Sequence, residues 1–545
     1  MGCWTKWLGI AMLGGVFGCS NDSPPAAPDG RTADARPNIL LIVADDLGFT
    51  DLGAFGSEIP TPNLDALAFA GVRLTNLHTG RACQQTRAML MSSRGVTSVI
   101  ETHPRRPDGQ RDNSLTTRIA ALPELMQDAG YSTYMAGKWD LGLSGEYAPA
   151  ARGFDRSFVL TEAAGSHFAE SLWGGRPYYE EDGVPLALED LPEDFYSTRV
   201  YTDKMLEYLQ AHDGDNPWFA YMPYTAPHWP LQVPEDWLDR HAGNYDAGYD
   251  VLRAERAARA GELGVIPAGA TLEAFEPVAL PWSELSADER AKFSRAQEIY
   301  AGMVEYLDLS IGRVIAYLED SDQLDTTVVV FMSDHGASAG QHAVYTGRGP
   351  KMTGGPPIPD NKDNRLENFG RIGSFIDHGV GFGEAATAPL KYFKGRLSEG
   401  GIRAAALIRY PSVISEPGID GTYMTVMDIL PTFLEIAGTE HPGEGLYRGR
   451  EIMPILGESF WPYLSGEKSA VHDSADVAGW SANGAGAIIR GNYKLINEGP
   501  PGGTGEEMPW RLYDISVDPG ETNDIAMDHP ELTAELIEEW ETHWR

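Results

Sequence analysis

Cysteine and basic side chains are both scarce in this chain of 545 residues. Lysine and arginine together number 42 against 79 aspartates and glutamates, which leaves a formal net charge of −37. This balance argues against a nucleic-acid partner, because phosphate binding requires clustered positive charge. It indicates a solvated acidic exterior, so an anionic ligand would need a local group of cations inside its binding site.

The chain has only 3 cysteines, at positions 3, 19 and 83, which excludes a disulfide framework. Cys3 and Cys19 fall in an N-terminal leader, so we expect a single thiol, Cys83, in the body of the protein. An unpaired cysteine in an exported protein has two interpretations. It is either a reactive group or a small buried apolar side chain.

The N-terminal apolar stretch, residues 7–18, is too short to span a bilayer. It follows Lys6 and has the length and flanks of a signal-peptide core. It ends at Phe17-Gly18-Cys19, which resembles the bacterial lipobox, in which the cysteine is lipidated. We predict a lipoprotein-type signal peptide over residues 1–19, with ordinary cleavage slightly downstream as the alternative.

The segment after this leader, residues 20–36, is rich in Ser, Pro, Ala and Asp and predicts a flexible tether. The leader and the tether together indicate an exported protein. We expect it in the periplasm or at the outer membrane of a bacterium, attached to the membrane only through an N-terminal lipid.

Short apolar runs alternate with amphipathic segments in the body of the chain, which predicts βα units and a largely parallel sheet. Continuous apolar runs at 38–44, 218–224 and 326–332 are typical of strands covered on both faces. Residues 131–136 are also strand-like, and helical spacing predicts helices over 119–129 and 299–318. Residues 229–298 predict a partly helical insertion, and residues 340–382 a long loop over a site.

The composition changes near the C-terminus, where strands are expected at 487–496 and 510–515 and a helix at 530–544. We therefore predict two domains, an α/β domain followed by an α+β domain. Residues 37–455 would form an α/β domain with a large mixed, mostly parallel sheet sandwiched by helices. Residues 456–545 would form a smaller C-terminal α+β domain.

Polar side chains follow four of the predicted strands at their carboxyl ends. They are Asp45 and Asp46, Lys138 and Asp140, His228, and Asp334 and His335. Ligands of open α/β sheets bind at this edge, so we expect these side chains to lie together. Taken singly, each is equally consistent with a solvated strand exit, a turn or a surface residue. Several converging carboxylates repel one another unless a cation lies among them, so the pattern predicts a divalent metal.

Cys83 precedes a helix that is expected to begin near Thr86. A nucleophile at a helix N-terminus faces free N–H groups and the positive end of the helix dipole, which favours an oxyanion. Arg87, one helical turn along, can bind both this centre and a charged oxyanion through two parallel hydrogen bonds.

These motifs occur in a recognisable order along the chain. They are Asp-Asp at 45–46, Cys-Gln-Gln-Thr-Arg at 83–87, Gly-Lys-Trp at 137–139, Ala-Pro-His-Trp-Pro at 226–230, Ser-Asp-His-Gly at 333–336, Gly-Gly-Ile-Arg at 400–403 and Thr-Val-Met-Asp-x-x-Pro-Thr at 425–432. The set resembles the sulfatase family of the alkaline phosphatase superfamily, with bacterial arylsulfatases as the nearest match. The similarity runs from about Pro37 to the C-terminus and includes residues 512–514 and 518–521.

The resemblance implies a sulfuric ester hydrolase acting on a sulfated small molecule or glycan. In that family a maturation enzyme oxidises the cysteine corresponding to Cys83 to formylglycine, and the aldehyde hydrate is the nucleophile. One hydroxyl attacks sulfur and the alcohol leaves. The second hydroxyl, once deprotonated, collapses the hemiacetal and expels sulfate.

The resemblance also implies roles for individual residues. A calcium ion, with magnesium or another divalent cation as the alternative, would be bound by Asp45, Asp46, Asp334, His335 and the modified Cys83. Arg87 would stabilise the formylglycine, Lys138 and Lys394 would bind sulfate oxygens, and His228 would be the general acid. Lys391 lies close to Lys394 and is the alternative at that position.

Three residues depart from the family pattern. Gln85 stands where the modification motif has proline or alanine, and His335 replaces the more common asparagine, although imidazole is not a preferred calcium ligand. Asp140 replaces a histidine that deprotonates the hydrate, and it adds negative charge beside an anionic substrate.

Because of these departures, two other functions stay open. One is a phosphodiesterase or phosphonate hydrolase with unmodified Cys83 or a hydroxyl nucleophile, and the other is a non-catalytic lipoprotein that binds sulfated glycans.

Overall fold

The computed structural model describes residues 36–103, 112–172, 179–270, 276–340, 361–482, 484–499 and 508–545. The predicted signal peptide and nearly all of the predicted tether lie outside these residues. Among the described helices, none is both long and apolar enough to cross a membrane. Residues 36–545 form one folded unit, within which the predicted domain boundary near residue 456 stays a prediction.

An 11-stranded mixed sheet forms the centre of this unit, in the order β12-β2-β11-β10-β1-β9-β5-β6-β7-β8, with β13 paired to β2. The parallel strands are β10 (Thr327–Ser333), β1 (Asn38–Ala44), β9 (Trp218–Pro223), β5 (Ser132–Lys138) and β6 (Arg156–Leu160). Strand β11 (Arg403–Arg409) runs antiparallel between β10 and β2 (Val72–His78). The remaining strands, towards the two sides of the sheet, are β12 (Gly418–Asp420), β13 (Met424–Thr425), β7 (Tyr179–Glu181) and β8 (Val184–Leu186). The predicted mixed, mostly parallel sheet is confirmed.

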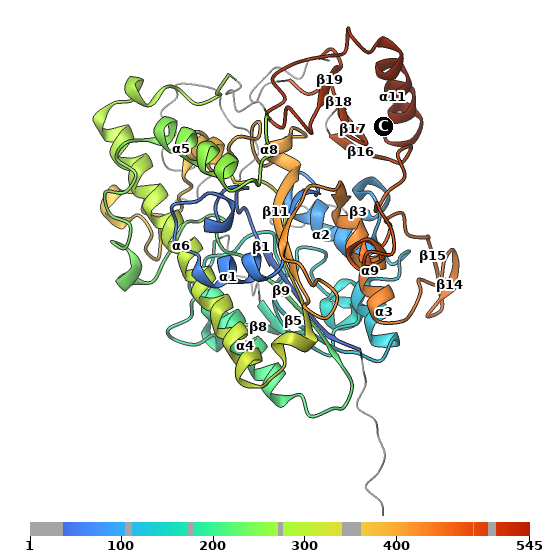
Figure 1. Ribbon diagram of the computed structural model, residues 1–545. Coiled ribbons are helices and arrows are strands. Elements are labelled where there is room, and N and C mark those ends of the chain that lie inside the picture. Colours follow the sequence, from blue (N-terminus) through green and yellow to red (C-terminus); the bar gives the residue numbers. More distant parts are fainter. Residues whose placement is uncertain are drawn as a thin grey trace, which may run out of the picture. The chain divides into compact units, whose positions relative to one another are not determined.

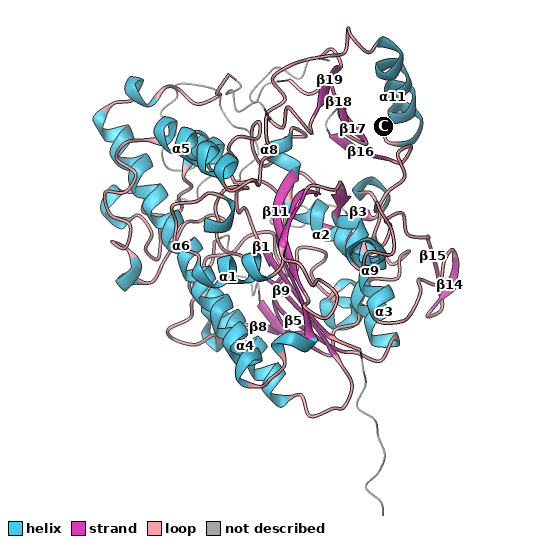
Figure 2. Cartoon of the chain, in the orientation of Figure 1, coloured by secondary structure: helices cyan, strands magenta, loops and turns pink. Residues whose placement is uncertain are grey.

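Helices cover both faces of the sheet (Figures 1 and 2). Alternate residues of β1 point to opposite faces: Leu40 and Ile42 join one apolar core, and Ile39 and Leu41 join the other. The first core is covered by α1 (Pro62–Ala70), α4 (Ser197–Ala211), α5 (Tyr249–Glu262), α6 (Ala287–Asp320) and α7 (Gly379–Ala386). The second is covered by α2 (Cys83–Ser92), α3 (Leu122–Asp128) and α9 (Ile429–Ile436). Each fully buried aliphatic side chain contributes about 1.5–3 kcal/mol.

Two helices differ in length from the prediction. Helix α6 begins at Ala287, well before residue 299, because Ser286 and Glu289 form a capping box at its N-terminus. Helix α3 is shorter than predicted and starts at Leu122, with Pro123 in its first turn. The predicted insertion contains α5, whereas residues 341–360 of the predicted long loop lie outside the described residues.

The C-terminal region forms a separate 4-stranded antiparallel sheet. Its strands are β16 (Val477–Ala482), β17 (Ala485–Arg490), β18 (Tyr493–Ile496) and β19 (Arg511–Asp514). The single strand predicted over 487–496 is wrong, because Gly491 adopts a positive φ of 59° and turns the chain between β17 and β18. Helix α11 (Pro530–His543) packs on one face through Leu536 and Trp540. The other face packs against Leu397, which precedes α8 (Glu399–Ile402), and against Ile402, the last residue of that helix.

The described fold also contains smaller elements. They include the hairpins β3 (Ile100–His103) with β4 (Asp112–Leu115) and β14 (Gly445–Tyr447) with β15 (Arg450–Ile452), the helical turn α10 (Trp461–Leu464) and several short 3-10 helices.

Candidate active site

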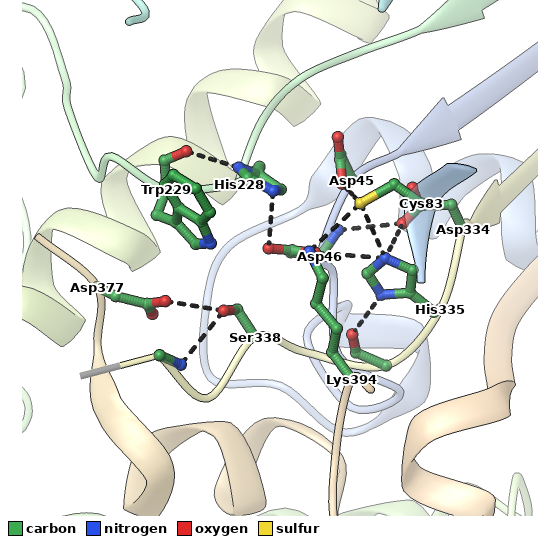
Figure 3. A network of polar contacts seen from close by, with 12 residues as sticks. Asp45, Asp46, Cys83, His228, Trp229, Asp334, His335, Ser338, Asp377 and Lys394 are labelled. Atoms are coloured by element: carbon green, nitrogen blue, oxygen red, sulfur yellow. Dashed lines mark hydrogen bonds and ion pairs between the residues drawn. The ribbon is translucent and has the colours of Figure 1, made fainter. Parts of the chain in front are cut away.

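The site lies at the carboxyl ends of the parallel strands, where the sequence predicts it (Figure 3). Asp45 and Asp46 directly follow β1, and Asp334 and His335 directly follow β10. The two strands pair in parallel register up to Ala44 and Ser333, so the two polar pairs lie side by side. The backbone N–H of Asp46 donates to Asp334 Oδ1 at 3.2 Å.

Four of the predicted metal ligands form one buried cluster. Possible ligand atoms of Asp45, Asp46, Cys83 and His335 all lie within 4.8 Å of one another. His335 Nε2 is 3.2 Å from Cys83 Sγ and 3.5 Å from Asp46 Oδ1. The fifth predicted ligand, Asp334, has its Oδ1 3.4 Å from the same imidazole nitrogen.

This donor set suits a divalent cation. Asp46 Oδ2 is buried and accepts no hydrogen bond from the described residues. A buried polar oxygen without a partner costs free energy, and a cation among the carboxylates removes that cost. Carboxylate oxygens are the ligands that calcium and magnesium prefer. The residues present therefore fit the predicted metal.

Three cationic side chains surround the same carboxylates. Lys138 Nζ lies 2.6 Å from Asp45 Oδ2, and Lys394 Nζ lies 2.5 Å from Asp46 Oδ1. Arg87 Nη2 lies 3.1 Å from Asp334 Oδ2 and 3.4 Å from Asp45 Oδ2, while its Nη1 donates to the Lys138 carbonyl at 2.9 Å. This is the local group of cations that an anionic ligand requires in a protein of such negative charge.

The cationic side chains do not stabilise the charged forms of the three carboxylates equally. Burial acts against ionisation of Asp45, but the charges of Lys138 and Arg87 hold the pKa of Asp45 well below its usual value. Burial raises the pKa of Asp46, and it raises the pKa of Asp334 to about 6. The protein's own cations thus compensate one of the three carboxylates much better than the other two.

Cys83 is the first residue of α2, so this helix begins earlier than the predicted start near Thr86. The expected position at a helix N-terminus is confirmed. Its thiol is free and donates to Asp45 Oδ1 at 3.3 Å, and Lys394 Nζ lies 3.3 Å from the sulfur. Burial, followed by the negative charge of Asp45, raises the pKa of the Cys83 thiol well above its usual value.

His228 directs one ring nitrogen towards the cluster. Its Nδ1 lies 2.6 Å from the Trp229 carbonyl oxygen, which can only accept, so Nδ1 carries the hydrogen. Nε2 then faces Asp46, 3.6 Å from Oδ2 (Figure 3). Burial and the charge of Lys394 lower the pKa of His228 well below its usual value, so the ring is neutral in this arrangement.

Asp140, the residue that departs from the family pattern, also lies in the site. It follows β5 in the left-handed backbone region, with φ 56°, and its Oδ2 is 4.0 Å from Lys138 Nζ. Gln84, the neighbour of Cys83, donates to the Asp140 carbonyl at 3.0 Å. Burial raises the pKa of Asp140 to about 6, which suits a group that exchanges a proton near neutral pH.

The structure distinguishes the two lysines near residue 394. Lys394 lies in the cluster, whereas Lys391 Nζ donates to the Glu521 carbonyl oxygen at 3.0 Å, away from Cys83. The geometry therefore favours Lys394 over the alternative Lys391.

Sequence reasoning missed other polar groups beside the cluster. Asp377 accepts from Ser338 at 2.8 Å, and burial raises the pKa of Asp377 to about 7. Tyr300 donates to Asp51 Oδ2 at 2.6 Å, and its hydroxyl lies 3.2 Å from the Asp46 carbonyl oxygen. Neither Asp377 nor Tyr300 belongs to a motif. Of Asp377, Tyr300 and Ser338, only Ser338 lies shortly after a predicted strand, so only Ser338 could have been predicted as a site residue from the sequence.

The chain is similar to known proteins over most of its length. The family model described as Sulfatase matches residues 37–439. The chain is 42% identical over 525 residues to an uncharacterized sulfatase of Schizosaccharomyces pombe, covering 93% of each chain. It is 32% identical over 435 residues to an arylsulfatase of Klebsiella aerogenes, covering 78% of this chain and 91% of that protein. The crystal structure of Ps i-CgsB in complex with k-i-k-neocarrahexaose matches with a TM-score of 0.64 at 22% identity, covering 93% of this chain and 92% of that one.

Proposed function

The chain belongs to the sulfatase family, and on that premise we propose that it hydrolyses a sulfate ester with a formylglycine derived from Cys83 and one bound divalent cation. The observation that supports this most strongly is the buried cluster in which Cys83 lies among Asp45, Asp46 and His335. A non-catalytic glycan-binding protein has no evident need for this set of buried charges.

The cation would be held by Asp45, Asp46, Asp334 and His335 together with the modified Cys83. Calcium is the proposed ion, because three of the protein ligands are carboxylates. When bound, it supplies positive charge that stabilises the negative charge of the transition state. His335 is the unusual ligand in this set, because imidazole is not a preferred calcium ligand. Magnesium or another divalent cation is therefore the alternative.

The cationic side chains would bind the sulfate group. Lys138 and Lys394 each contact a carboxylate of the cluster, at 2.6 Å and 2.5 Å. Once those carboxylates are compensated by a metal, both ammonium groups can donate to sulfate oxygens. Arg87, fully buried at the first turn of α2, orients residue 83 and adds positive charge beside it.

His228 and Asp140 would transfer protons in two different steps of the reaction. His228 Nε2 would protonate the leaving alcohol, and the negative charge of a bound sulfate ester favours the imidazolium form that this needs. Asp140, with a pKa of about 6, would accept the proton from the hydrate of residue 83, in place of the usual histidine.

The substrate class we propose is an aryl sulfate or a sulfated glycan. The relative from Klebsiella aerogenes is named an arylsulfatase, and Ps i-CgsB was solved with the oligosaccharide k-i-k-neocarrahexaose. The test is sulfate release from 4-nitrophenyl sulfate by protein produced together with a formylglycine-generating enzyme. Turnover of a phosphonate or phosphate diester, without sulfate release, would support the phosphodiesterase or phosphonate hydrolase alternative and contradict the proposal.

Gln85→Pro is expected to raise the aldehyde fraction at Cys83 and the rate of sulfate release together. The reason is that Gln85 departs from the modification motif while it lies outside the cluster of catalytic side chains. Peptide mass spectrometry and 4-nitrophenyl sulfate turnover on the same samples measure both quantities, with Gln85→Asn as the matched control. A rate that rises while the aldehyde fraction stays constant would contradict this account of Gln85.

Cys19→Ala is expected to move the protein from the membrane to the soluble fraction after export. We propose a lipid anchor at Cys19, since buried acyl chains contribute about 0.8 kcal/mol per CH₂ group to membrane binding. Fractionation of cells that express each form measures the effect, with Cys3→Ala as the control. A wild-type protein that is already soluble after export would show that the leader is removed by ordinary cleavage.

A further inference from the structure

A buried cluster of charged side chains joins the C-terminal sheet to the rest of the unit. Lys494 of β18 lies 2.8 Å from Glu399 Oε1 and 3.0 Å from Glu521 Oε1. The backbone N–H of Glu399 donates to Glu521 Oε2 at 2.9 Å. On the other side, His78 at the end of β2 contacts both oxygens of Glu399 at 3.1 Å. The side chains of Lys494, Glu399 and Glu521 are at most 1% exposed.

Stability alone is a poor explanation for this cluster. Removing charges from water costs several kcal/mol per ion, and apolar side chains of similar volume are often as stabilising as a buried ion pair. Apolar packing is available at the same interface, where Leu397 and Ile402 belong to one apolar cluster with Ile489 and Tyr513. What the ion cluster adds is a fixed geometry, because each charge must meet its partner at a defined position.

The cluster is connected to Lys394 through a short segment. Glu399 lies five residues after Lys394, and the segment 391–399 contacts the C-terminal part of the chain on both sides of Lys394. Lys391 donates to the Glu521 carbonyl at 3.0 Å, and the Leu397 backbone N–H donates to Glu498 Oε2 at 2.7 Å. Within the segment, the Lys394 backbone N–H donates to the Ala337 carbonyl at 3.0 Å, next to the end of β10.

The same sheet also contacts the loop that leads to Cys83. The indole N–H of Trp480 in β16 donates to the Thr79 carbonyl at 2.9 Å. Further along this loop, Arg81 and Gly395 exchange two hydrogen bonds of 2.7 Å, one from the Gly395 N–H and one from Arg81 Nη1. The C-terminal sheet therefore restrains both the residue that bears the thiol and the lysine 3.3 Å from it.

We propose that the C-terminal sheet positions Lys394 and Cys83 for the reaction, with Lys494 and Trp480 as the positioning residues. Lys494 acts through Glu399 and Glu521 on the Lys394 segment, and Trp480 acts through Thr79 on the Cys83 loop. The inference rests on the proposed function insofar as it assigns these restraints to catalysis. Neither residue contacts the reacting groups, so both act through others.

The test compares Lys494→Met with Arg490→Met in the full-length, matured protein. Arg490 lies in the same sheet but pairs with the exposed Glu535 on α11, so it serves as the matched control. Misplacement of a reacting group by about 1 Å costs up to about 100-fold in rate, so we expect Lys494→Met to lower kcat/KM for 4-nitrophenyl sulfate by about 10- to 100-fold. Arg490→Met is expected to stay within about twofold.

A double-mutant cycle with Lys394→Ala separates positioning from general destabilisation. If Lys494 acts through Lys394, the effect of Lys494→Met shrinks strongly once Lys394 is absent. Additive effects, or a wild-type kcat/KM in folded Lys494→Met, would overturn the inference. If Lys494→Met does not fold, Glu521→Gln and Trp480→Phe replace it, since Glu521→Gln keeps the size of the side chain and removes one charge, and Trp480→Phe keeps an aromatic ring and removes the indole donor.

Hydrogen exchange provides a readout that does not depend on turnover. Lys494→Met is expected to increase exchange in residues 391–402, and Trp480→Phe in residues 79–83, with strands β1 and β10 unchanged. A wild-type protein that releases no sulfate would contradict the proposed function only, and unchanged exchange in both segments would contradict this inference only.

Discussion

Cys83→Ala lowers sulfate release from 4-nitrophenyl sulfate by roughly four orders of magnitude or more, because it removes the thiol that the maturation enzyme needs in order to oxidise the Cβ carbon to the aldehyde. The folded state should survive, since the substitution removes one sulfur atom from a side chain that is already small and buried. Steady-state kinetics and thermal unfolding of the purified proteins measure the two effects separately.

Cys83→Ser provides the sharper control for this prediction. It places a hydroxyl at the N-terminus of α2 in place of the thiol, and it is inactive if the maturation enzyme accepts only cysteine. Substantial sulfate release from Cys83→Ser would favour a hydroxyl nucleophile on the same scaffold. Substantial release from Cys83→Ala would remove residue 83 from the mechanism altogether.

Removal of the metal by a chelator is expected to lower the rate by roughly 10³-fold, the equivalent of several kcal/mol of lost charge stabilisation in the transition state. Added calcium should restore the rate. A bound ion at about 100 times its Kd also stabilises the folded state by about 2.7 kcal/mol, so the unfolding midpoint should rise with calcium.

Asp46→Asn tests the same site without a chelator. Asp46 offers the buried oxygen that accepts no hydrogen bond from the described residues, so its neutral analogue should lose most of the calcium-dependent rise in the unfolding midpoint. The exposed Asp194, which pairs only at the surface with Arg199, serves as the control in Asp194→Asn. Full activity in metal-stripped wild-type protein would contradict the metal centre.

Four central parallel strands of the sheet, β1, β5, β9 and β10, could be predicted from the sequence, for a physical reason. Strands β1, β9 and β10 are buried on both faces, so they consist of continuous apolar residues that stand out in the sequence. The edge strands β8 and β12 escaped prediction because each has only 3 residues and is partly exposed. Short, half-polar strands are specified by their neighbours rather than by their own pattern.

The residues of the site also differ in whether the sequence pattern alone could predict them. Asp45, Asp334 and His228 could be placed together because the topology brings the ends of parallel strands to one edge. Lys394 lies on no strand, so only the family resemblance pointed to it. Its position depends on contacts such as the pair of Glu399 with Lys494, 95 residues apart, which no local pattern reveals.

The chemical state of residue 83 tests the central claim most directly. Peptide mass spectrometry across residue 83 should be performed on a preparation whose sulfate release has been measured. We predict an aldehyde in place of the thiol, in a fraction that increases in proportion to the rate as maturation is made more complete. Robust sulfate release from protein that contains only intact cysteine at position 83 would contradict the account.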